Sequence, residues 1–301
     1  MNDSINILKA AQTSFIPNKE IFPYIIQIGT GGTGGYLTQH ISQLLGVSKK
    51  RGAYTVVDPD VIETKNLGNQ LFLPEEVGLK KAEVLAQRYS YAYGIDIATY
   101  TDNYIESVED IRKLFTSEYL QVHNYRSDIL FLPILIGCVD NNFSRSILNT
   151  FFETSKTCIY IDAGNESTVV PKDWQVRTKS SWTEEELIAF NESGWSGQVV
   201  TGVKLNLFKQ PPVAEVFPDI LEDKDSFVKP SELSCTELTA SEPQRLIVNK
   251  FAAMIISNIL TQIVEDYTIS SHMTVFHAKK AYMRSTPIQN VQKNVYSTNS
   301  N

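Results

Sequence analysis

Cysteine is scarce in this chain, with three among 301 residues and no pair at Cys-X-X-Cys spacing. This scarcity speaks against a disulfide framework and a four-cysteine zinc site, because both require several cysteines at short spacings. His272 and His277 alone cannot form a tetrahedral zinc site, so we expect no zinc. Cys138 and Cys158 lie in apolar segments, where free cysteines usually pack in the core. Separated cysteines suit a reducing compartment, and we expect a cytoplasmic location.

The sequence also has few basic residues relative to acidic ones and few long apolar runs. Lys and Arg number 27 against 34 Asp and Glu, which gives a formal net charge of −7. An acidic protein is repelled by phosphate backbones and anionic lipid surfaces. We find no N-terminal apolar stretch typical of a signal peptide and expect no run long enough to cross a bilayer. The composition therefore predicts a protein that binds neither nucleic acid nor membranes.

A glycine-rich turn is the most informative motif that is present. Residues 29–35 read Gly-Thr-Gly-Gly-Thr-Gly-Gly, just behind the apolar run 24–26. Leu37, Ile41 and Leu45 then fall on one helical face. Glycines let the backbone approach an anion, while free N–H groups and the dipole at a helix N-terminus stabilise negative charge. A strand, a glycine turn and a helix in this order predict a phosphate-binding site.

Two carboxylates end the next predicted strand. The run 53–57 leads directly to Asp58 and Asp60. Asp58 follows the glycine turn at about the 20-residue spacing at which the carboxylate of a Rossmann fold contacts ribose hydroxyls. Capping of the next turn is the alternative role for this side chain.

A polar cluster follows that a nicotinamide oxidoreductase does not need. It comprises residues 66–70, Asn-Leu-Gly-Asn-Gln, and residues 78–82, Gly-Leu-Lys-Lys-Ala. A site for a nucleoside triphosphate does need such residues, because amides and a lysine can hold the phosphates that leave as pyrophosphate. The cluster therefore favours a triphosphate ligand over a dinucleotide.

A third block begins with the apolar run 134–139 and continues through Asp140 and Arg145 to Asn149. In an open α/β sheet, ligands bind at the carboxyl ends of the strands, where Asp140 is expected to lie. A carboxylate at that edge can hold a Mg²⁺ that bridges phosphate oxygens. Arg145 is either catalytic or forms a salt bridge that holds the following helix.

Taken in order, the blocks resemble the ThiF/MoeB/HesA family, whose adenylating fold is shared with ubiquitin-activating enzymes. The family's succession of GxGGxG, DxDxVexxNLxRQ, GxxKA and DNxxxRxxxN is matched over residues 24–149. The resemblance implies ATP and Mg²⁺ as ligands, with Asp58 on the ribose and Asp140 on the metal. It also implies Lys81 and Arg145 as catalytic candidates. The nucleotide-binding residues that it implies are Gly29, Gly31, Gly32, Gly34, Asp58, Asp60, Asn66, Asn69, Gln70, Lys81, Asp140 and Asn141.

One position departs from the family pattern. Where the family has arginine before the glutamine of its second block, this chain has Asn69. An arginine would contact a triphosphate through two N–H groups at once, whereas asparagine offers a neutral amide. Either another cation replaces the arginine or adenylation is slowed. A subunit that binds ATP without catalysing adenylation is therefore an alternative.

Cys235 lies in a polar stretch between a proline-rich, acidic segment and an apolar helix. By resemblance it matches the catalytic cysteine of the thioester-forming members of the family. Its thiol would attack an acyl-adenylate, whose AMP is a good leaving group, and form a thioester. No basic residue adjoins it to lower the thiol pKa, so packing at a helix start is an equal alternative. Four stretches also resemble the ThiF-type proteins of PRTRC mobile-element systems: 162–165, 196–200, 234–238 and 243–249.

The remaining segments define the expected domain organisation. A capping box at Thr183 and Glu186 predicts a short helix, and the apolar pattern of residues 249–264 predicts a long one. We expect an N-terminal arm or short helix (1–20), a Rossmann-like adenylation core (21–170), an insertion and crossover (171–232), a C-terminal part of the same domain with Cys235 (233–287) and a flexible tail (288–301).

These observations predict an α/β fold. We expect a Rossmann-like, mainly parallel sheet with helices on both faces, plus extra C-terminal strands and a helix. The resemblance implies a homodimer that adenylates the C-terminal carboxylate of a small ubiquitin-like, β-grasp protein. Adenylation of a small molecule, a non-catalytic ATP-binding subunit and a nicotinamide oxidoreductase are the alternatives.

Overall fold

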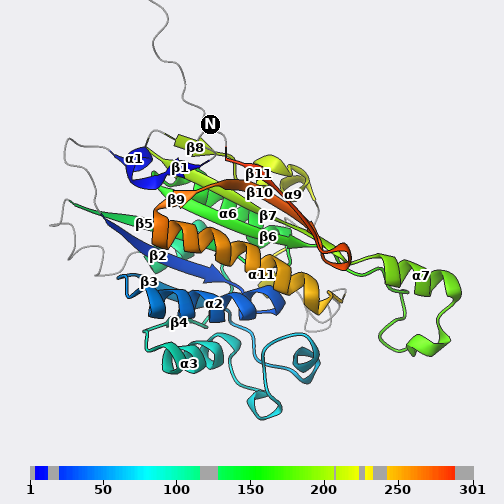
Figure 1. Ribbon diagram of the computed structural model, residues 1–301. Helices are drawn as coiled ribbons and strands as arrows, with labels where there is room; N and C mark the ends of the chain where they lie inside the picture. Colours follow the sequence, from blue (N-terminus) through cyan, green and yellow to red (C-terminus); the bar gives the residue numbers. More distant parts are fainter. Residues whose placement is uncertain are drawn as a thin grey trace, which may run out of the picture.

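One nine-stranded sheet runs through the computed structural model, which describes residues 4–12, 20–115, 128–206, 208–223, 228–232 and 243–288 (Figure 1). Its strands are β2 (Glu20–Ile28), β3 (Ala53–Val57), β4 (Ala98–Tyr100), β5 (Ile129–Gly137), β6 (Cys158–Asn165), β7 (Ser196–Leu205), β8 (Phe208–Gln210), β10 (Ser271–His277) and β11 (Tyr282–Pro287). The order across the sheet is β11-β10-β7-β6-β5-β2-β3-β4, and β8 pairs with β7.

The sheet has a parallel half and an antiparallel half. Strands β4, β3, β2, β5 and β6 are parallel to one another, whereas β7, β10 and β11 add in antiparallel pairings. The parallel strands β2 and β5 are near-continuous apolar runs, as expected for strands that are covered on both faces. The prediction of a mainly parallel Rossmann-like sheet with extra C-terminal strands is confirmed.

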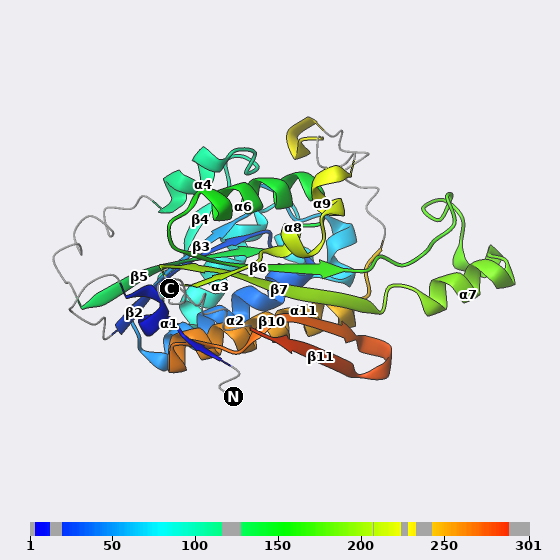
Figure 2. The ribbon, with the colours of Figure 1, turned by 90° about the horizontal axis from the view of Figure 1, so that it is seen from above.

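Helices cover both faces of this sheet (Figure 2). Helices α1 (Ile7–Ala11), α2 (Gly32–Ser48), α3 (Lys81–Tyr93) and α11 (Leu246–Thr261) lie on one face. Helices α4 (Val108–Phe115), α6 (Asn142–Thr154), α8 (Val213–Val216) and α9 (Asp219–Glu222) lie on the other. Shorter turns are η1 (Thr64–Gly68), η2 (Pro74–Glu76), η3 (Lys179–Ser181), η5 (Pro230–Glu232) and η7 (Ala278–Lys280), and the π-helical turn η6 (Gln262–Asp266) continues α11.

The N-terminal residues belong to the packed body. Strand β1 (Ile5–Asn6) pairs antiparallel with β9 (Thr268–Ile269) in a small second sheet. Ile7 at the start of α1 is fully buried, and its N–H donates to the carbonyl of Tyr267 at 2.9 Å. The short helix expected within residues 1–20 is therefore present, and it is docked against β7 and against Tyr267, which follows η6.

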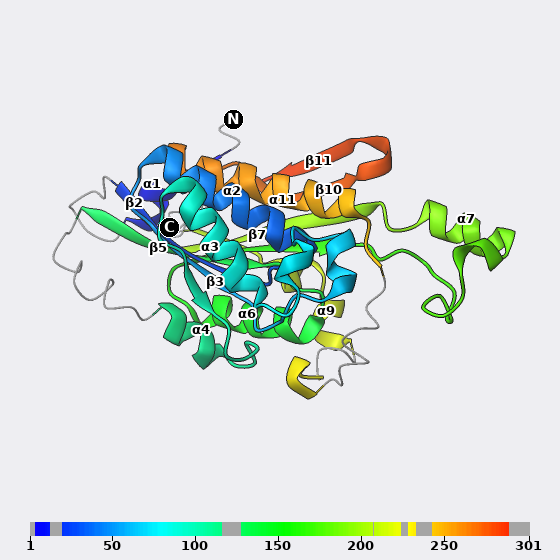
Figure 3. The ribbon, with the colours of Figure 1, turned by 90° about the horizontal axis from the view of Figure 1, so that it is seen from below.

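The segment expected as an insertion and crossover, 171–232, is only partly an insertion. It contains β7, which pairs with β6 on one side and β10 on the other, because its central run 199–203 is continuously buried in the sheet. The part that leaves the body is residues 166–195, which we call the arm, and it carries α7 (Glu184–Glu192) away from the sheet (Figures 1 and 3). Thr183 caps α7 together with Glu186, as the sequence predicted.

Helix α11 corrects one expectation. With η6 it forms a helix over Leu246–Asp266 that is long and apolar enough to cross a membrane by length and composition, although the sequence was expected to hold no such run. Val248, Ala252, Ile256 and Leu260 are fully buried, because α11 packs between α2 and the strands β6 and β7. A helix that is apolar around most of its circumference is typical of a buried core element as well as of a membrane span.

Candidate active site

The glycine turn joins β2 to α2 and leaves little room around its backbone. Gly29 has a φ of +94°, and a Cβ there would lie 2.4 Å from the carbonyl oxygen of Cys138. A Cβ at Gly34 would lie 2.1 Å from the carbonyl oxygen of Gly29. Only glycine fits these two positions. A Cβ at Gly31 would meet only Nε2 of Gln70, at 3.8 Å, so the space beside Gly31 is open to a ligand.

Gln27 holds the glycine turn from within the core. Its side chain is fully buried, and Nε2 donates to the carbonyl oxygens of Gly29 and Gly34 at 2.9 and 3.0 Å. Nε2 also lies 3.1 Å from Oγ1 of Thr38, and the hydroxyl of Tyr54 donates to Oε1 at 2.8 Å. The Gln27 side chain thus connects the start of the turn, at Gly29, with its end, at Gly34. Gln27 was not predicted from the sequence, although a polar residue in an otherwise apolar strand was a usable signal.

Asp58 ties the end of β3 to the same turn. Its Oδ2 accepts hydrogen bonds from the N–H and the hydroxyl of Thr30, at 2.8 and 2.6 Å, and its Oδ1 accepts from the N–H of Asp60 at 2.9 Å. Burial raises the pKa of Asp58, and the nearby charge of Lys81 opposes that rise. Each carboxylate oxygen has two acceptor sites, so Asp58 retains capacity for a ligand hydroxyl while it also caps the turn.

Lys81 forms an ion pair with Asp60 next to Asp58. Its Nζ lies 2.9 Å from Oδ2 of Asp60, and the hydroxyl of Tyr104 donates to Oδ1 at 2.6 Å. Burial opposes ionisation of Asp60, but Lys81 and Tyr104 lower its pKa overall. Burial likewise opposes the charge of Lys81, but Asp58 and Asp60 raise its pKa. Lys81 therefore stays protonated, and its charge is shared between two carboxylates.

Three amide side chains lie at η1, beside the glycine turn. Asn66 is buried, and its Oδ1 accepts the N–H of Glu63 at 2.9 Å, which caps η1. Oδ1 of Asn69 and Oε1 of Gln70 are buried without a hydrogen-bond partner in the described residues. An unpartnered buried acceptor is costly, and rotation of either amide presents NH₂ donors instead. Asn69 and Gln70 therefore fit a ligand that carries hydroxyl and phosphate groups beside Gly31.

Asp140 and Asn141 lie just after the carboxyl end of β5 and differ in their contacts. Oδ1 of Asn141 accepts the N–H of Ser144 at 2.8 Å and caps α6. Asp140 is exposed, and within the described ranges it makes no hydrogen bond or ion pair. Those ranges hold no cluster of three or more metal-ligating side chains. Mg²⁺ commonly takes one or two carboxylates and completes its shell with phosphate and water oxygens, so the free carboxylate of Asp140 fits that ion.

Arg145 holds the start of α6 against β6. Its Nε lies 3.1 Å from Oδ1 of the buried Asp162, and its Nη2 donates to the carbonyl oxygens of Val139 and Ala163 at 2.7 and 3.1 Å. Nη1 donates to Oδ1 of Asn142 at 3.3 Å. The salt-bridge alternative accounts for these contacts, and a catalytic role would require the guanidinium to leave them.

Asn249 of α11 reaches the glycine turn from the C-terminal part of the chain. Its Oδ1 accepts hydrogen bonds from Oγ1 of Thr33 at 3.0 Å and from Nδ2 of Asn165 at 2.8 Å. A Cβ at Gly32 would lie 2.1 Å from Nδ2 of Asn249. Asn249 was not predicted from the sequence to have a role at this site. The available signal was a single amide on the otherwise apolar face of a long helix.

The cysteines separate into two groups. Cys158 is fully buried and Cys138 is half-buried, and burial raises the pKa of both thiols, that of Cys158 to about 12. Neither is therefore suited to act as a nucleophile near neutral pH. Cys235, the candidate nucleophile, lies outside the described residues.

The three sequence blocks thus meet at one edge of the sheet. The glycine turn contacts the second block through Thr30 and Asp58, and it contacts the end of β5 through Gly29 and Cys138. Lys81 and Asp60 lie beside this junction, and Asp140 follows Cys138 just after the carboxyl end of β5. The arrangement offers a narrow backbone turn, amide donors and a free carboxylate, which together suit a Mg²⁺-bound nucleotide.

Comparison with known proteins extends this picture. The chain is 27% identical over 123 residues to ubiquitin-like modifier-activating enzyme 5 of Culex quinquefasciatus, a match that covers 40% of this chain and 29% of that protein. The structure is similar to E. coli MccB, with a TM-score of 0.52, 16% identity and coverage of 88% of this chain and 63% of MccB. It is also similar to PaaA, with a TM-score of 0.53, 13% identity and coverage of 89% and 73%.

The chain spans less than two thirds of the length of MccB and of the activating enzyme. At these identities the similarity to the solved structures establishes the fold. The sequence itself matches the model of the ThiF family over residues 23–297, and the chain therefore belongs to the ThiF family.

Proposed function

We propose that this chain is an ATP-dependent adenylating enzyme that activates the C-terminal carboxylate of a small ubiquitin-like protein. The observation that carries the proposal is the junction of the glycine turn, Asp58 and the free carboxylate of Asp140 at one sheet edge. MccB structures with ATP and with AMPCPP and MccA support a nucleotide and a polypeptide as the two substrates. The relative named as a ubiquitin-like modifier-activating enzyme supports a ubiquitin-like partner.

The reaction follows from the chemistry of the site. A carboxylate oxygen of the partner attacks the α-phosphorus of ATP, the bond from that phosphorus to the bridging oxygen breaks, and pyrophosphate leaves. Asn66, Asn69, Gln70 and the backbone N–H groups of the glycine turn stabilise the charge on the phosphates, with Lys81 close by. Mg²⁺ held by Asp140 would neutralise phosphate charge in the ground and transition states.

Cys235 is the proposed acceptor of the activated acyl group. Its thiolate attacks the acyl carbon, the bond from that carbon to the phosphate oxygen breaks, and AMP leaves. The product is a thioester, and the thiol proton goes to solvent. Incubation with ATP and the partner should yield an adduct that is cleaved by dithiothreitol and is absent in Cys235→Ala. A dithiothreitol-cleaved adduct that survives in Cys235→Ala would exclude this role.

Pyrophosphate exchange into ATP tests the adenylation step. We expect exchange that requires Mg²⁺ and a cognate β-grasp protein and that is lost in Asp140→Ala. Asp96→Ala is the matched control, because Asp96 is exposed and lies away from the turn. Well-folded wild-type protein that binds ATP but shows no exchange with its partner would contradict the proposal.

A non-catalytic ATP-binding subunit is the second candidate. Two observations favour it: Asn69 stands where the family has arginine, and the charge of Lys81 is taken up by Asp60. ATP binding without exchange, restored by adding a second family member, would identify this function. Exchange with a peptide or a small carboxylic acid alone would instead identify a substrate other than a ubiquitin-like protein.

We further propose that the enzyme works in the cytoplasm as a homodimer, within the PRTRC-type subgroup that residues 234–238 and 243–249 resemble. Light scattering at micromolar concentration tests the oligomeric state, and a mass of 33.9 kDa would indicate a monomer.

A further inference from the structure

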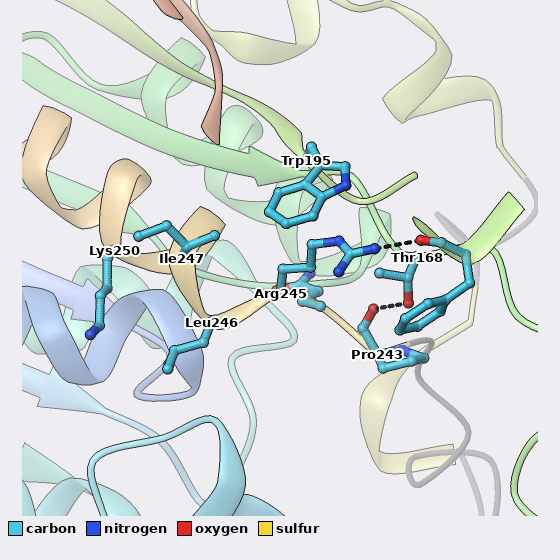
Figure 4. A pocket seen from close by; sticks show the side chains of 9 residues that line it. Thr168, Trp195, Pro243, Arg245, Leu246, Ile247 and Lys250 are labelled. Carbon is cyan, nitrogen blue, oxygen red and sulfur yellow. Dashed lines mark hydrogen bonds between the residues drawn. The ribbon is translucent and has the colours of Figure 1, made fainter. Parts of the chain in front are cut away.

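A pocket of about 420 Å³ opens where the arm meets the first turn of α11 (Figure 4). We call it the α11 pocket. Its apolar walls are Phe190 and Trp195 from the arm side and Leu246 and Ile247 from the helix. Leu246 and Ile247 are 38% and 40% exposed, so two large apolar side chains face a hollow rather than the core. Exposed apolar residues that gather in a concavity are typical of a binding site.

Arg245 joins the two walls of the pocket. Its Nε and Nη2 donate to the carbonyl oxygens of Ser193 and Phe190, and the guanidinium carbon lies 3.9 Å from the ring centre of Trp195. Nη1 has no hydrogen-bond partner in the described residues. Stacking on an aromatic ring holds the guanidinium in place while it leaves an N–H edge for a ligand.

The positive charge at the pocket is not matched by an ion pair. Neither Arg245 nor Lys250 forms a salt bridge with any residue that the structure describes. Two carboxylates act on Arg245 from a distance: Glu166 accepts hydrogen bonds from backbone N–H groups, and Glu192 pairs with Lys279 at 2.7 Å. Burial lowers the pKa of Arg245 more than these carboxylates raise it. Among the described residues, the pocket therefore combines apolar walls with two cations that have no close anion.

The α11 pocket also borders the glycine turn. Asn249, which follows the pocket residues in α11, accepts a hydrogen bond from Thr33 of the turn. Lys250, the last residue of the pocket wall, has its Nζ 5.2 Å from the ring centre of Tyr36 in α2. A peptide segment seated in the pocket would thus lie beside the proposed nucleotide site.

We propose that the α11 pocket binds a short acidic and apolar segment of the polypeptide whose carboxylate this chain activates. An apolar side chain of that segment packs against Trp195 and Ile247, one carboxylate pairs with Arg245, and a second carboxylate pairs with Lys250, whose side chain points away from Arg245 toward α2 (Figure 4). The identity of the partner rests on the proposed function, but binding of the segment requires neither ATP nor catalysis. Since one wall belongs to the arm, the arm takes part in choosing the partner.

Binding of model peptides to the full chain tests the pocket directly. The probe is the blocked tetrapeptide acetyl-Asp-Leu-Leu-Asp-amide, followed through the tryptophan indole signals in a ¹H–¹⁵N spectrum. Three such signals are expected, and Trp195→Phe identifies the one from the pocket. We expect this signal to shift saturably. Replacement of both Asp by Asn, or of both Leu by Ala, should weaken binding about tenfold, the effect of one lost charged or apolar contact.

Variants of the chain separate the pocket from general effects. Lys250→Met should weaken the acidic peptide about tenfold and leave the Asn peptide unchanged, because only a charge contact is removed. Ile247→Asp should abolish binding of both. Lys113→Met is the control, since Lys113 is exposed on α4, on the opposite face of the sheet. Unchanged ATP affinity in each variant shows that the fold is intact.

Two outcomes would overturn the inference. One is equal affinity for the acidic, Asn and Ala peptides, and the other is a Trp195 signal that does not respond to any of them. If the chain binds the acidic peptide but shows no pyrophosphate exchange, the proposed peptide pocket stands and the proposed adenylation is excluded. If the chain exchanges pyrophosphate but does not bind the peptides, the proposed adenylation stands and the proposed peptide pocket is excluded.

Discussion

Thr33 donates a hydrogen bond of 3.0 Å to Asn249, although 216 residues separate them in the chain. Asn165 at the end of β6 joins the pair, with its Nδ2 2.8 Å from Oδ1 of Asn249 and 3.0 Å from Oγ1 of Thr33. The start of α2 is therefore supported by α11, a helix from the far end of the chain. The glycine turn depends on this support as well as on its own glycines.

Gly32→Ala tests the contact between α2 and α11. The added Cβ would lie 2.1 Å from Nδ2 of the buried Asn249, so either the turn or α11 must shift. Overpacking of this kind costs about 1–3 kcal/mol. We expect a lower free energy of unfolding in urea and weaker ATP binding by calorimetry.

The double variant Gly32→Ala/Asn249→Ala separates this contact from a general intolerance of Gly32. Removal of the Asn249 side chain makes room for the new methyl group, so the double variant should lose less than the sum of the two single losses. The coupling should be about 1 kcal/mol or more, as is usual for residues in contact. Strictly additive losses would show that the steric contact does not limit the turn.

Gln27→Leu tests the buried side chain that connects the start and the end of the glycine turn. The change leaves the hydroxyl of Tyr54 and the carbonyl oxygen of Gly29 without their partner, whereas the carbonyl oxygen of Gly34 keeps the hydroxyl of Thr38. Each unsatisfied buried group costs about 1–3 kcal/mol, so we expect a loss of at least 2 kcal/mol in urea unfolding. Gln43→Leu on the exposed side of α2 is the matched control, with an expected change within about 0.5 kcal/mol. Equal effects of the two changes would contradict the assigned role.

The ion pair of Asp60 and Lys81 makes a pH-dependent contribution to stability. The pKa of Asp60 is lowered in the folded protein, despite partial burial, because Lys81 and Tyr104 favour its ionised form. A lowered folded pKa stabilises the protein above the unfolded value, about 4, and that contribution is lost as the pH falls through the folded value. The stability difference between wild type and Asp60→Asn should therefore be constant from pH 7 to 5 and shrink below pH 4. A difference that stays constant to pH 3 would argue against the ion pair.

Asn69→Arg tests the departure from the family pattern. The half-buried Asn69 has an unpartnered Oδ1 and adjoins Gln70, whose Nε2 is the nearest group to Gly31. An arginine at this position can contact phosphate oxygens through two N–H groups. We expect about tenfold tighter ATP binding, the worth of one charge-assisted contact, and faster pyrophosphate exchange. Weaker ATP binding in a well-folded Asn69→Arg variant would show that another group already contacts the phosphates where the arginine was expected to lie.

Local patterns were sufficient to predict the parallel half of the sheet. The apolar runs that became β2, β3 and β5 are each followed by a polar motif, and parallel strands bring their carboxyl ends to one edge. The contact between the glycine turn and Asp58 could therefore be inferred from the sequence. The position of β7 could not, because antiparallel addition to β6 depends on pairing with β10, more than 70 residues later.

The glycine turn, the two carboxylates after β3 and the capping box of α7 were determined by the sequence alone, because each depends on residues close together in the chain. Tertiary structure alone decided that Lys81 pairs with Asp60, that Arg145 is held by Asp162 and that Asn249 contacts Gly32. These contacts depend on how helices and strands pack. Packing decides which groups come within a few ångströms of a side chain. Those groups determine the side chain's charge state and whether it is free to bind a ligand.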